Sequence, residues 1–183
     1  MNLVERVKGI ILTPKTEWPV IAGEPGDVGT LFGSYVAILA AIPAVCGFIG
    51  AVVIGAPIGA ALLGAVVHYL LTFVILYVVA LIVDALAPTF GSSKNFPNAL
   101  KLTVYSYTPS WLVGIFLLIP ALRFLTILGL YGLYLLWLGL PPLMKTPSEK
   151  TIGYTIAIVI CALIIAIVVA MVIGALIGFH SMM

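Results

Sequence analysis

Charged residues are scarce in this chain of 183 residues. Asp, Glu, Lys and Arg make up 8% of it, against about 25% in a typical soluble domain. Hydrophobic residues make up 63%, and eight bases with six acids are too few to cover a water-facing surface. The composition excludes a soluble enzyme and a disordered chain. A net charge of +2 also provides no basic surface for nucleic acid. A membrane protein with several spans remains.

Cysteines and catalytic motifs are sparse as well. The chain has two cysteines and two histidines, too few for a disulfide framework or a zinc site. The sequence contains no Gly-x-Ser-x-Gly, no His-Glu-x-x-His and no phosphate-binding glycine loop. Five of the six acids fall outside the apolar runs, so paired catalytic carboxylates within a bundle are unsupported. We therefore expect a protein that is not an enzyme and that binds no cofactor and no metal.

Long uncharged runs predict membrane-spanning helices. No Asp, Glu, Lys or Arg occurs in the 53 residues from Leu31 to Val83. One helix of that length would be more than twice as long as a bilayer core is thick. Gly55-Ala56-Pro57 breaks this run into two spans. We predict an all-α membrane protein, a bundle of five transmembrane helices over residues 31–54, 58–86, 99–118, 124–140 and 152–177.

The first thirty residues have a different pattern. Leu3, Val7 and Ile10 recur at helical spacing between charged residues, which is typical of a short amphipathic helix in the membrane interface. Trp18 follows, and tryptophan is common at the level of the lipid headgroups. We predict a cytoplasmic amphipathic segment over residues 1–30 and a five-span membrane domain over residues 31–183.

The basic residues predict the orientation in the membrane. With five spans, seven of the eight bases lie on one side and only Arg123 lies on the other. Cytoplasmic segments carry the excess of Lys and Arg. The amino terminus is therefore predicted in the cytoplasm and the carboxyl terminus outside. The membrane is the cell membrane, which is the inner membrane if the source is bacterial.

Three ionisable residues within the predicted spans are candidate site residues. His68 and Asp84 are 16 positions apart in the second span, about 24 Å along a helix. One interpretation is a proton or ion relay between them. The other is an interfacial pair of Asp84 with Lys101, and a histidine that is hydrogen-bonded to a neighbouring helix.

Four tyrosines are the remaining candidates. Tyr105 and Tyr107 lie in the third span, and Tyr131 and Tyr134 lie in the fourth. Their hydroxyls need hydrogen-bond partners inside a bilayer. They either line a polar cavity between the two spans or form hydrogen bonds that lock the two helices together.

Short blocks along the chain resemble a known family. The blocks are Arg6-Val7-Lys8 with Pro14 and Trp18, Ala41-Ile42-Pro43 with Phe48-Ile49-Gly50, residues 105–111, and residues 131–144 leading into Lys145, Pro147, Glu149-Lys150 and Gly153-Tyr154. In their order and spacing they resemble the Yip-domain family of Ypt/Rab-GTPase-interacting proteins, and its prokaryotic branch in particular. The resemblance implies five membrane helices and a cytoplasmic amino terminus.

The resemblance also implies a function for part of that family. Its eukaryotic members reside in endoplasmic-reticulum and Golgi membranes, contact prenylated Rab GTPases and assist vesicle traffic. Here the amino-terminal segment lacks their longer extension. Gly29-Thr30-Leu31-Phe32-Gly33 also stands where they tend to carry Asp-Leu-Tyr-Gly-Pro. The missing acid and proline argue against a Rab-type GTPase partner.

Two functions remain open from the sequence. The first is a non-enzymatic membrane-organising or trafficking-like adaptor, which contacts membrane lipids and docks a protein or anionic-lipid partner on its cytoplasmic face. The second is a small transporter or lipid-handling bundle with a polar site between helices. A transporter should carry ionisable groups near the midplane that face a cavity, and His68 is the one candidate at that depth. The sequence leaves homo-oligomerisation open.

Overall fold

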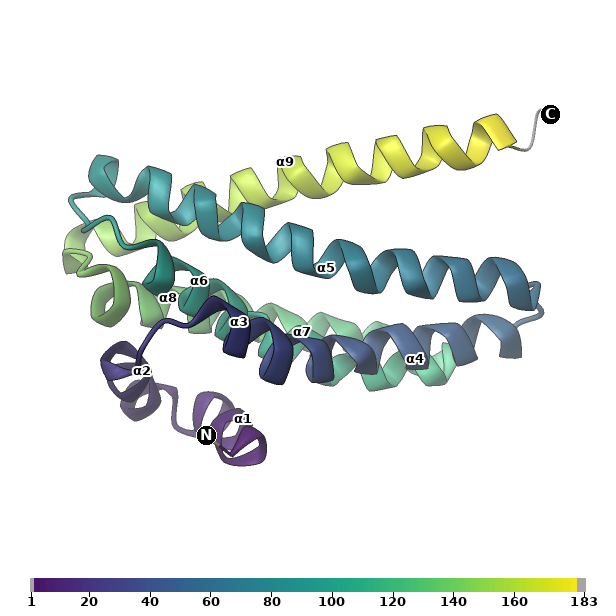
Figure 1. Cartoon of the computed structure of the whole chain (residues 1–183), viewed down its shortest axis with the longest axis horizontal. Coiled ribbons are helices and arrows are strands. Elements are labelled where there is room, and N and C mark those ends of the chain that lie inside the picture. The colour runs from purple at the N-terminus through teal and green to yellow at the C-terminus, as the bar shows by residue number, and fades with distance from the viewer. Residues whose placement is uncertain (1, 181–183) are drawn as a thin grey trace.

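Helices joined by short loops make up the part of the chain that the structure describes. The structure is a computed structural model covering the backbone of residues 2–180 and the side chains of residues 2–169 and Met171. The elements are α1 (Leu3–Leu12), α2 (Pro14–Gly23), α3 (Val28–Thr30), η1 (Leu31–Val36), α4 (Ala37–Val53), α5 (Ile58–Leu86), η2 (Ala87–Phe90), α6 (Phe96–Ser106), α7 (Thr108–Val113), η3 (Gly114–Leu118), η4 (Pro120–Leu130), α8 (Tyr131–Met144) and α9 (Ser148–His180). Figure 1 shows an elongated bundle with α4, α5 and α9 along its length and α1 and α2 beside one end.

Four stretches within the described residues are long and apolar enough to cross a membrane. They are Val28–Val53, Ile58–Phe90, Pro120–Met144 and Ser148–Val169. The predicted second span, 58–86, coincides with α5. Large apolar side chains such as Leu63 and Phe124 are exposed along these stretches, as expected of helices that a bilayer surrounds.

The third predicted span is not one helix. Residues 96–118 form α6, α7 and η3, which are 11, 6 and 5 residues long. The helix is interrupted at Tyr107, because Pro109 has no backbone N–H and its ring disfavours an unbroken helix through the preceding turn. The prediction of a single helix over residues 99–118 is therefore wrong.

These three short segments nevertheless follow α3 and α4 along the bundle. A Cβ atom added to Gly26 would lie 2.4 Å from the Pro97 Cβ atom. Further along, a Cβ atom on Gly50 would lie 2.0 Å from the carbonyl oxygen of Leu117. Residue 26 lies beside residue 97, and residue 50 lies beside residue 117. The stretches 26–50 and 97–117 therefore run in the same direction. Glycine is needed at position 50 because the two backbones approach too closely for a side chain.

The fourth predicted span ends too early. The sequence places its end at Leu140, before Pro141 and Pro142, but α8 continues through both prolines to Met144. The chain then turns at Lys145, whose φ of 54° lies in the left-handed region. The first part of this stretch, η4, is a 3₁₀-helix of 11 residues, longer than most.

The core lies toward the end of the bundle where α1 and α2 pack. The fully buried large side chains there come from both the amino-terminal helices and the bundle. They are Ile10, Trp18 and Ile21 from α1 and α2, Leu100 and Leu102 from α6, and Leu135, Leu140 and Leu143 from α8. The first two helices are therefore part of the folded core.

Candidate functional site

α1 and α2 form a helical hairpin, called here the N-terminal hairpin (residues 3–23), which packs against the bundle. α1 contacts α7, and α2 contacts α8. Ile10 and Ile21 point into the core, while Val4 and Leu12 are exposed on the other side. The amphipathic pattern therefore buries one face against protein and leaves a second face free.

Trp18 anchors this hairpin in the bundle. Its side chain is 1% exposed, and its ring meets the ring of Tyr105 edge to face at a centroid distance of 6.4 Å. A Cβ atom on Gly139 of α8 would lie 2.8 Å from two carbons of the indole. Trp18 therefore packs inside the protein, since the absent side chain at Gly139 leaves room for the indole between α6 and α8.

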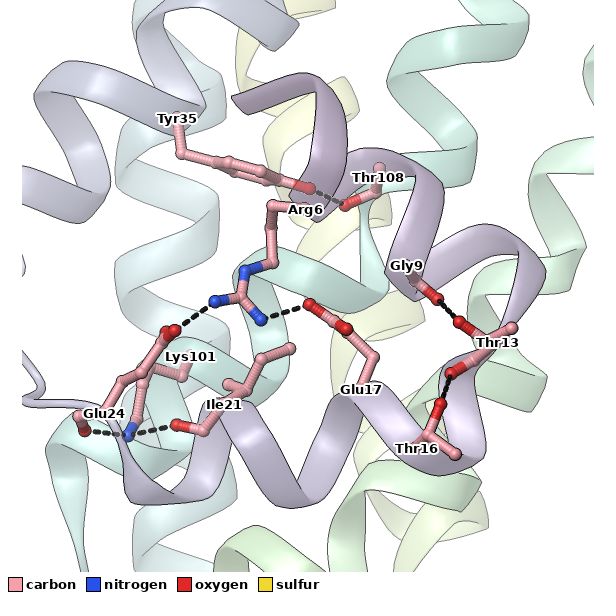
Figure 2. A network of polar contacts seen from close by, with 10 residues as sticks. All are labelled: Arg6, Gly9, Thr13, Thr16, Glu17, Ile21, Glu24, Tyr35, Lys101 and Thr108. Atoms are coloured by element: carbon pink, nitrogen blue, oxygen red, sulfur yellow. Dashed lines mark hydrogen bonds and ion pairs between the residues drawn. The ribbon is translucent and has the colours of Figure 1, made fainter. Parts of the chain in front are cut away.

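Arg6 of α1 points into the protein and joins α1 to both ends of α2. Figure 2 shows its guanidinium between the carboxylates of Glu17 and Glu24, with one terminal nitrogen donating to each. The side chain of Arg6 is 4% exposed. The guanidinium carbon also lies 5.7 Å from the centroid of the Tyr105 ring, in the range of a cation–π contact.

Lys101 of α6 holds the carboxyl end of α2. Its ammonium donates to the carbonyl oxygens of Ile21 and Glu24, each at 2.9 Å (Figure 2). The last carbonyls of a helix lack partners within the helix, and a cation is favourable there. The predicted pair of Asp84 with Lys101 is wrong, because Lys101 binds α2 instead. One carboxylate oxygen of Asp84 is buried without a hydrogen-bond partner among the described residues.

The polar network of Arg6, Glu17, Glu24 and Lys101 is balanced in charge, with two cations and two anions. Burial of an ion without a partner costs several kcal/mol. Arg6 has carboxylate partners, and Lys101 has the carbonyls of α2. Arg6, Glu17 and Glu24 hold α1 to α2. Lys101 of α6 holds this hairpin on the bundle, so a displaced hairpin would leave the Lys101 ammonium without its carbonyl partners.

Two further contacts brace the same region. The hydroxyl groups of Tyr35 in η1 and Thr108 in α7 share a hydrogen bond of 2.8 Å (Figure 2). The ring of Tyr35 also packs against that of Tyr105, with centroids 4.8 Å apart. A cavity of about 540 Å³ lies beside these groups, lined by Glu24, Tyr35, Lys101 and other residues.

Asp27 marks the start of the first membrane stretch. Its carboxylate accepts hydrogen bonds from the hydroxyl of Thr30 and from the backbone N–H groups of Thr30 and Gly29. These hydrogen bonds, that of the Thr30 hydroxyl above all, lower the pKa of Asp27 below its usual value. The charged form of Asp27 is therefore the one that caps this helix.

The residues needed to bind a metal do not gather in the described part of the chain. Within it, no three residues among His, Cys, Asp and Glu come close enough together to hold an ion. Cys46 and Cys161 are free thiols, each partly buried.

Comparison with known families decides the identity of this fold. A model of the Yip1 domain matches residues 8–178. The chain belongs to the Yip1 domain family. The family expected from the short sequence blocks is confirmed, and the Yip1-domain protein is an integral membrane protein.

Two curated relatives of this Yip1-domain chain are inner-membrane proteins by name. Both are called "Inner membrane protein YohC", one from Escherichia coli strain K12 and one from Escherichia coli O6:H1 strain CFT073. Each is 24% identical over 166 residues, covering 83% of this chain and 85% of the relative. The similarity supports an inner-membrane location. No solved structure matches the chain significantly.

The Yip1-domain structure brings some of the predicted site residues together and separates others. Lys101 and Tyr105 line one cavity, and the ring centroids of Tyr131 and Tyr134 lie 5.5 Å apart. His68 is exposed on α5, and Asp84 lies 16 positions away on the same helix. Tyr105 is buried, whereas Tyr134 is exposed beside Trp137, with ring centroids 6.0 Å apart. His68, Tyr105 and Tyr134 therefore do not surround one hydrated cavity.

The tyrosines bind other partners than the sequence predicts. The hydroxyl of Tyr131 donates to the carbonyl oxygen of Ile11 at 3.0 Å, so it ties α8 to the N-terminal hairpin. Tyr107 caps the end of α6, and its ring lies near that of Trp111, with centroids 6.3 Å apart. The prediction that tyrosines lock the third and fourth spans together is wrong for Tyr131.

The sequence interpretation missed the acids and the base that hold the hairpin. Glu17 and Glu24 are separated by seven positions, which is about two helical turns, so both face the same side. That spacing is a usable signal for a shared cationic partner. Nothing in the sequence identifies Arg6 as that partner, since Lys8 and Lys15 are both closer to the two acids along the chain.

Proposed function

We propose that this Yip1-domain protein is a non-enzymatic adaptor of the inner membrane, which presents the N-terminal hairpin to a cytoplasmic protein. One observation carries the proposal. The hairpin is fixed on its inner side by the buried polar network, and its outer side exposes apolar and basic residues together. These exposed residues are Val4, Lys8, Leu12, Lys15 and Val20.

The proposal includes five crossings of the membrane, the third being the broken run of α6, α7 and η3. It is supported by the way this run follows α3 and α4 in the same direction, from Gly26 beside Pro97 to Gly50 beside Leu117. With five crossings, seven of the eight bases share the side of the hairpin. The excess of bases supports a cytoplasmic position for that side and an external carboxyl terminus.

The exposed face favours an acidic protein partner with an apolar centre. Lys8 and Lys15 supply positive charge, and Leu12 supplies the largest exposed apolar fraction in the hairpin, at 73%. Charge complementarity gives such contacts specificity. A pre-organised surface binds with a smaller loss of entropy than a flexible one, and the polar network supplies that order.

Ion-coupled transport has less support from the structure. His68, the candidate at membrane depth, is exposed on α5. The cavity between α8 and α9 has no Asp, Glu, Lys, Arg or His among the lining residues that the structure describes. Transport of an ion or a proton would need such groups along its path.

Site-specific photocrosslinking in cells tests the adaptor function. A photoreactive amino acid at Leu12 or Val20 should capture a protein partner, whereas the same residue at Ile127, exposed in η4, should not. Reversal of two charges, Lys8→Glu with Lys15→Glu, should reduce capture at Leu12. The matched control Arg123→Glu should leave capture unchanged, because Arg123 lies in η4.

Two outcomes would overturn the proposal. Protein adducts only at Ile127 would place the partner on the wrong side. Lipid adducts alone at Leu12 and Val20 would show that the exposed face serves as a membrane anchor and recruits no protein.

A further inference from the structure

A second cavity, called here the α8–α9 cavity, lies away from the N-terminal hairpin. It has a volume of about 540 Å³ and is lined by residues of α6, α7, η4, α8 and α9 together with Val79 of α5. This volume falls within the roughly 300–1,000 Å³ typical of small-molecule sites. Figure 1 shows that α9 diverges from α5 toward its carboxyl end.

The cavity has one closed end and one open end. Thr103, Ser106 and Ile158 line the closed end and are buried. Phe124, Ile127 and Leu163 line the other end and are each more than half exposed. Because the exposed apolar faces of these helices contact lipid, the cavity opens to the bilayer and not to water.

Ser106 gives the closed end an unmet hydrogen-bonding requirement. Its side chain is 6% exposed, and its hydroxyl is buried without a hydrogen-bond partner among the described residues. Two of the neighbouring hydroxyls have partners within the protein, since Thr103 donates to the carbonyl oxygen of Ala99 at 2.9 Å and Thr126 to that of Arg123 at 2.7 Å. A buried hydroxyl without a partner costs free energy. A polar group from outside the chain that forms a hydrogen bond with Ser106 would remove this cost.

The lining residues also restrict the charge of an occupant. The polar residues around the cavity are Thr103, Ser106, Tyr107, Ser110 and Thr126, and none of the described residues that line it is Asp, Glu, Lys, Arg or His. An ion at the closed end would have no counter-charge and would pay the full cost of leaving water. The site therefore fits an uncharged polar group on an apolar chain.

We propose that the α8–α9 cavity binds an uncharged amphiphile from the membrane, with its hydroxyl or carbonyl group hydrogen-bonded to Ser106 and its apolar chain leaving through the open end. Phospholipids are excluded from the closed end by their charged headgroups. The site is independent of the adaptor function, because none of its lining residues belongs to the N-terminal hairpin.

The test uses the full chain in nanodiscs of phosphatidylethanolamine and phosphatidylglycerol. The probe is hexadecan-1-ol with a diazirine near its methyl end, and the comparison probe is hexadecyl sulfate with the same diazirine. The alcohol should label peptides from η4 and α9 saturably, and unlabelled hexadecan-1-ol should compete. The sulfate should label these peptides far less.

Two substitutions locate the site. Ser106→Ala should weaken binding of the alcohol by roughly two- to tenfold, the range for one hydrogen bond. Ala162→Phe, in the wall formed by α9, should abolish saturable labelling. Ala60→Phe is the matched control, because Ala60 is exposed on α5 outside the cavity, and it should label like the unmodified protein. If Ala162→Phe fails to fold, Ala166→Phe blocks the open end instead.

Several results would overturn the inference. Equal labelling by the alcohol and the sulfate would show that the closed end does not select an uncharged group. Saturable labelling that survives Ala162→Phe, or Ala166→Phe where that variant is used, would place the alcohol elsewhere. Unchanged binding by Ser106→Ala would mean that bulk lipid chains alone fill the cavity. The double variant Lys8→Glu with Lys15→Glu, which should lose protein capture, should still be labelled by the alcohol, so the two proposals can fail separately.

Discussion

Removal of Arg6 should release the N-terminal hairpin without unfolding the bundle. Arg6→Met keeps a long side chain but removes the cation that faces Glu17 and Glu24. The two carboxylates would then lie together without the guanidinium that separates them, and like charges repel. Both acids belong to α2 and its C-cap, so leaving the bundle does not separate them, but it exposes them to water, which weakens the repulsion.

The size of the effect follows from the exposure of the acids. Loss of one partner from a fully buried ion pair costs about 3–5 kcal/mol. Here the side chains of Glu17 and Glu24 are 20% and 34% exposed, so water offsets part of the loss. We expect about 1–3 kcal/mol, which is roughly a 5- to 150-fold rise in the open population.

Hydrogen exchange in nanodiscs measures that population directly. Peptides from α1 and α2 should exchange faster in Arg6→Met, while peptides from α5 keep their protection, because local opening is independent of global unfolding. Lys8→Met is the matched control, since Lys8 is an exposed base on the same helix. Additional Glu17→Gln and Glu24→Gln changes should restore part of the protection. If Arg6→Met and Lys8→Met exchanged alike, the polar network would not hold the hairpin.

Three further perturbations test neighbouring contacts. Gly139→Ala should speed exchange in α2, because the new methyl group would lie 2.8 Å from the Trp18 ring; Gly64→Ala, with no atom within 4 Å of its new methyl group, should be neutral or stabilising. Tyr35→Phe should lower the free energy of unfolding in detergent by about 1–3 kcal/mol, because the buried hydroxyl of Thr108 loses its partner at 2.8 Å; an unchanged denaturation midpoint would show that Thr108 finds another partner. Asp27 has a lowered folded-state pKa, so its stabilising effect is complete above its unfolded pKa of about 3.9 and is lost as the pH falls through the folded value. Thermal unfolding of Asp27→Asn should therefore lack that part of the acid destabilisation, and an identical acid profile would contradict this role.

The long apolar helices could be predicted from the sequence because one signal determines each of them. The uncharged run broken at Gly55-Ala56-Pro57 gave a second span that coincides with α5. Prolines made the other ends harder to predict. Pro109 interrupts the third span, whereas Pro141 and Pro142 are accommodated inside α8. The effect of a proline depends on whether neighbouring groups satisfy the freed carbonyls, which a single sequence does not show.

The site could be predicted less well, because tertiary contacts create it. In the sequence, Arg6 is one of several charged residues of a predicted amphipathic helix. In the structure it is buried between two acids that lie 11 and 18 positions further along the chain. Lys101 could be paired with Asp84 from span positions alone, but the free carbonyls at the end of α2 attract it instead. Such choices depend on how the hairpin docks, and no local pattern encodes that.

The membrane side of the carboxyl terminus tests the proposed five-span topology most directly. With five crossings, the hairpin is cytoplasmic and a carboxyl-terminal fusion is outside. An alkaline phosphatase fusion should therefore be active, and a GFP fusion should be dark. If residues 96–118 do not cross, only the four long stretches span the membrane, and both termini lie on one side. A fluorescent GFP fusion with an inactive phosphatase fusion would contradict the proposed topology.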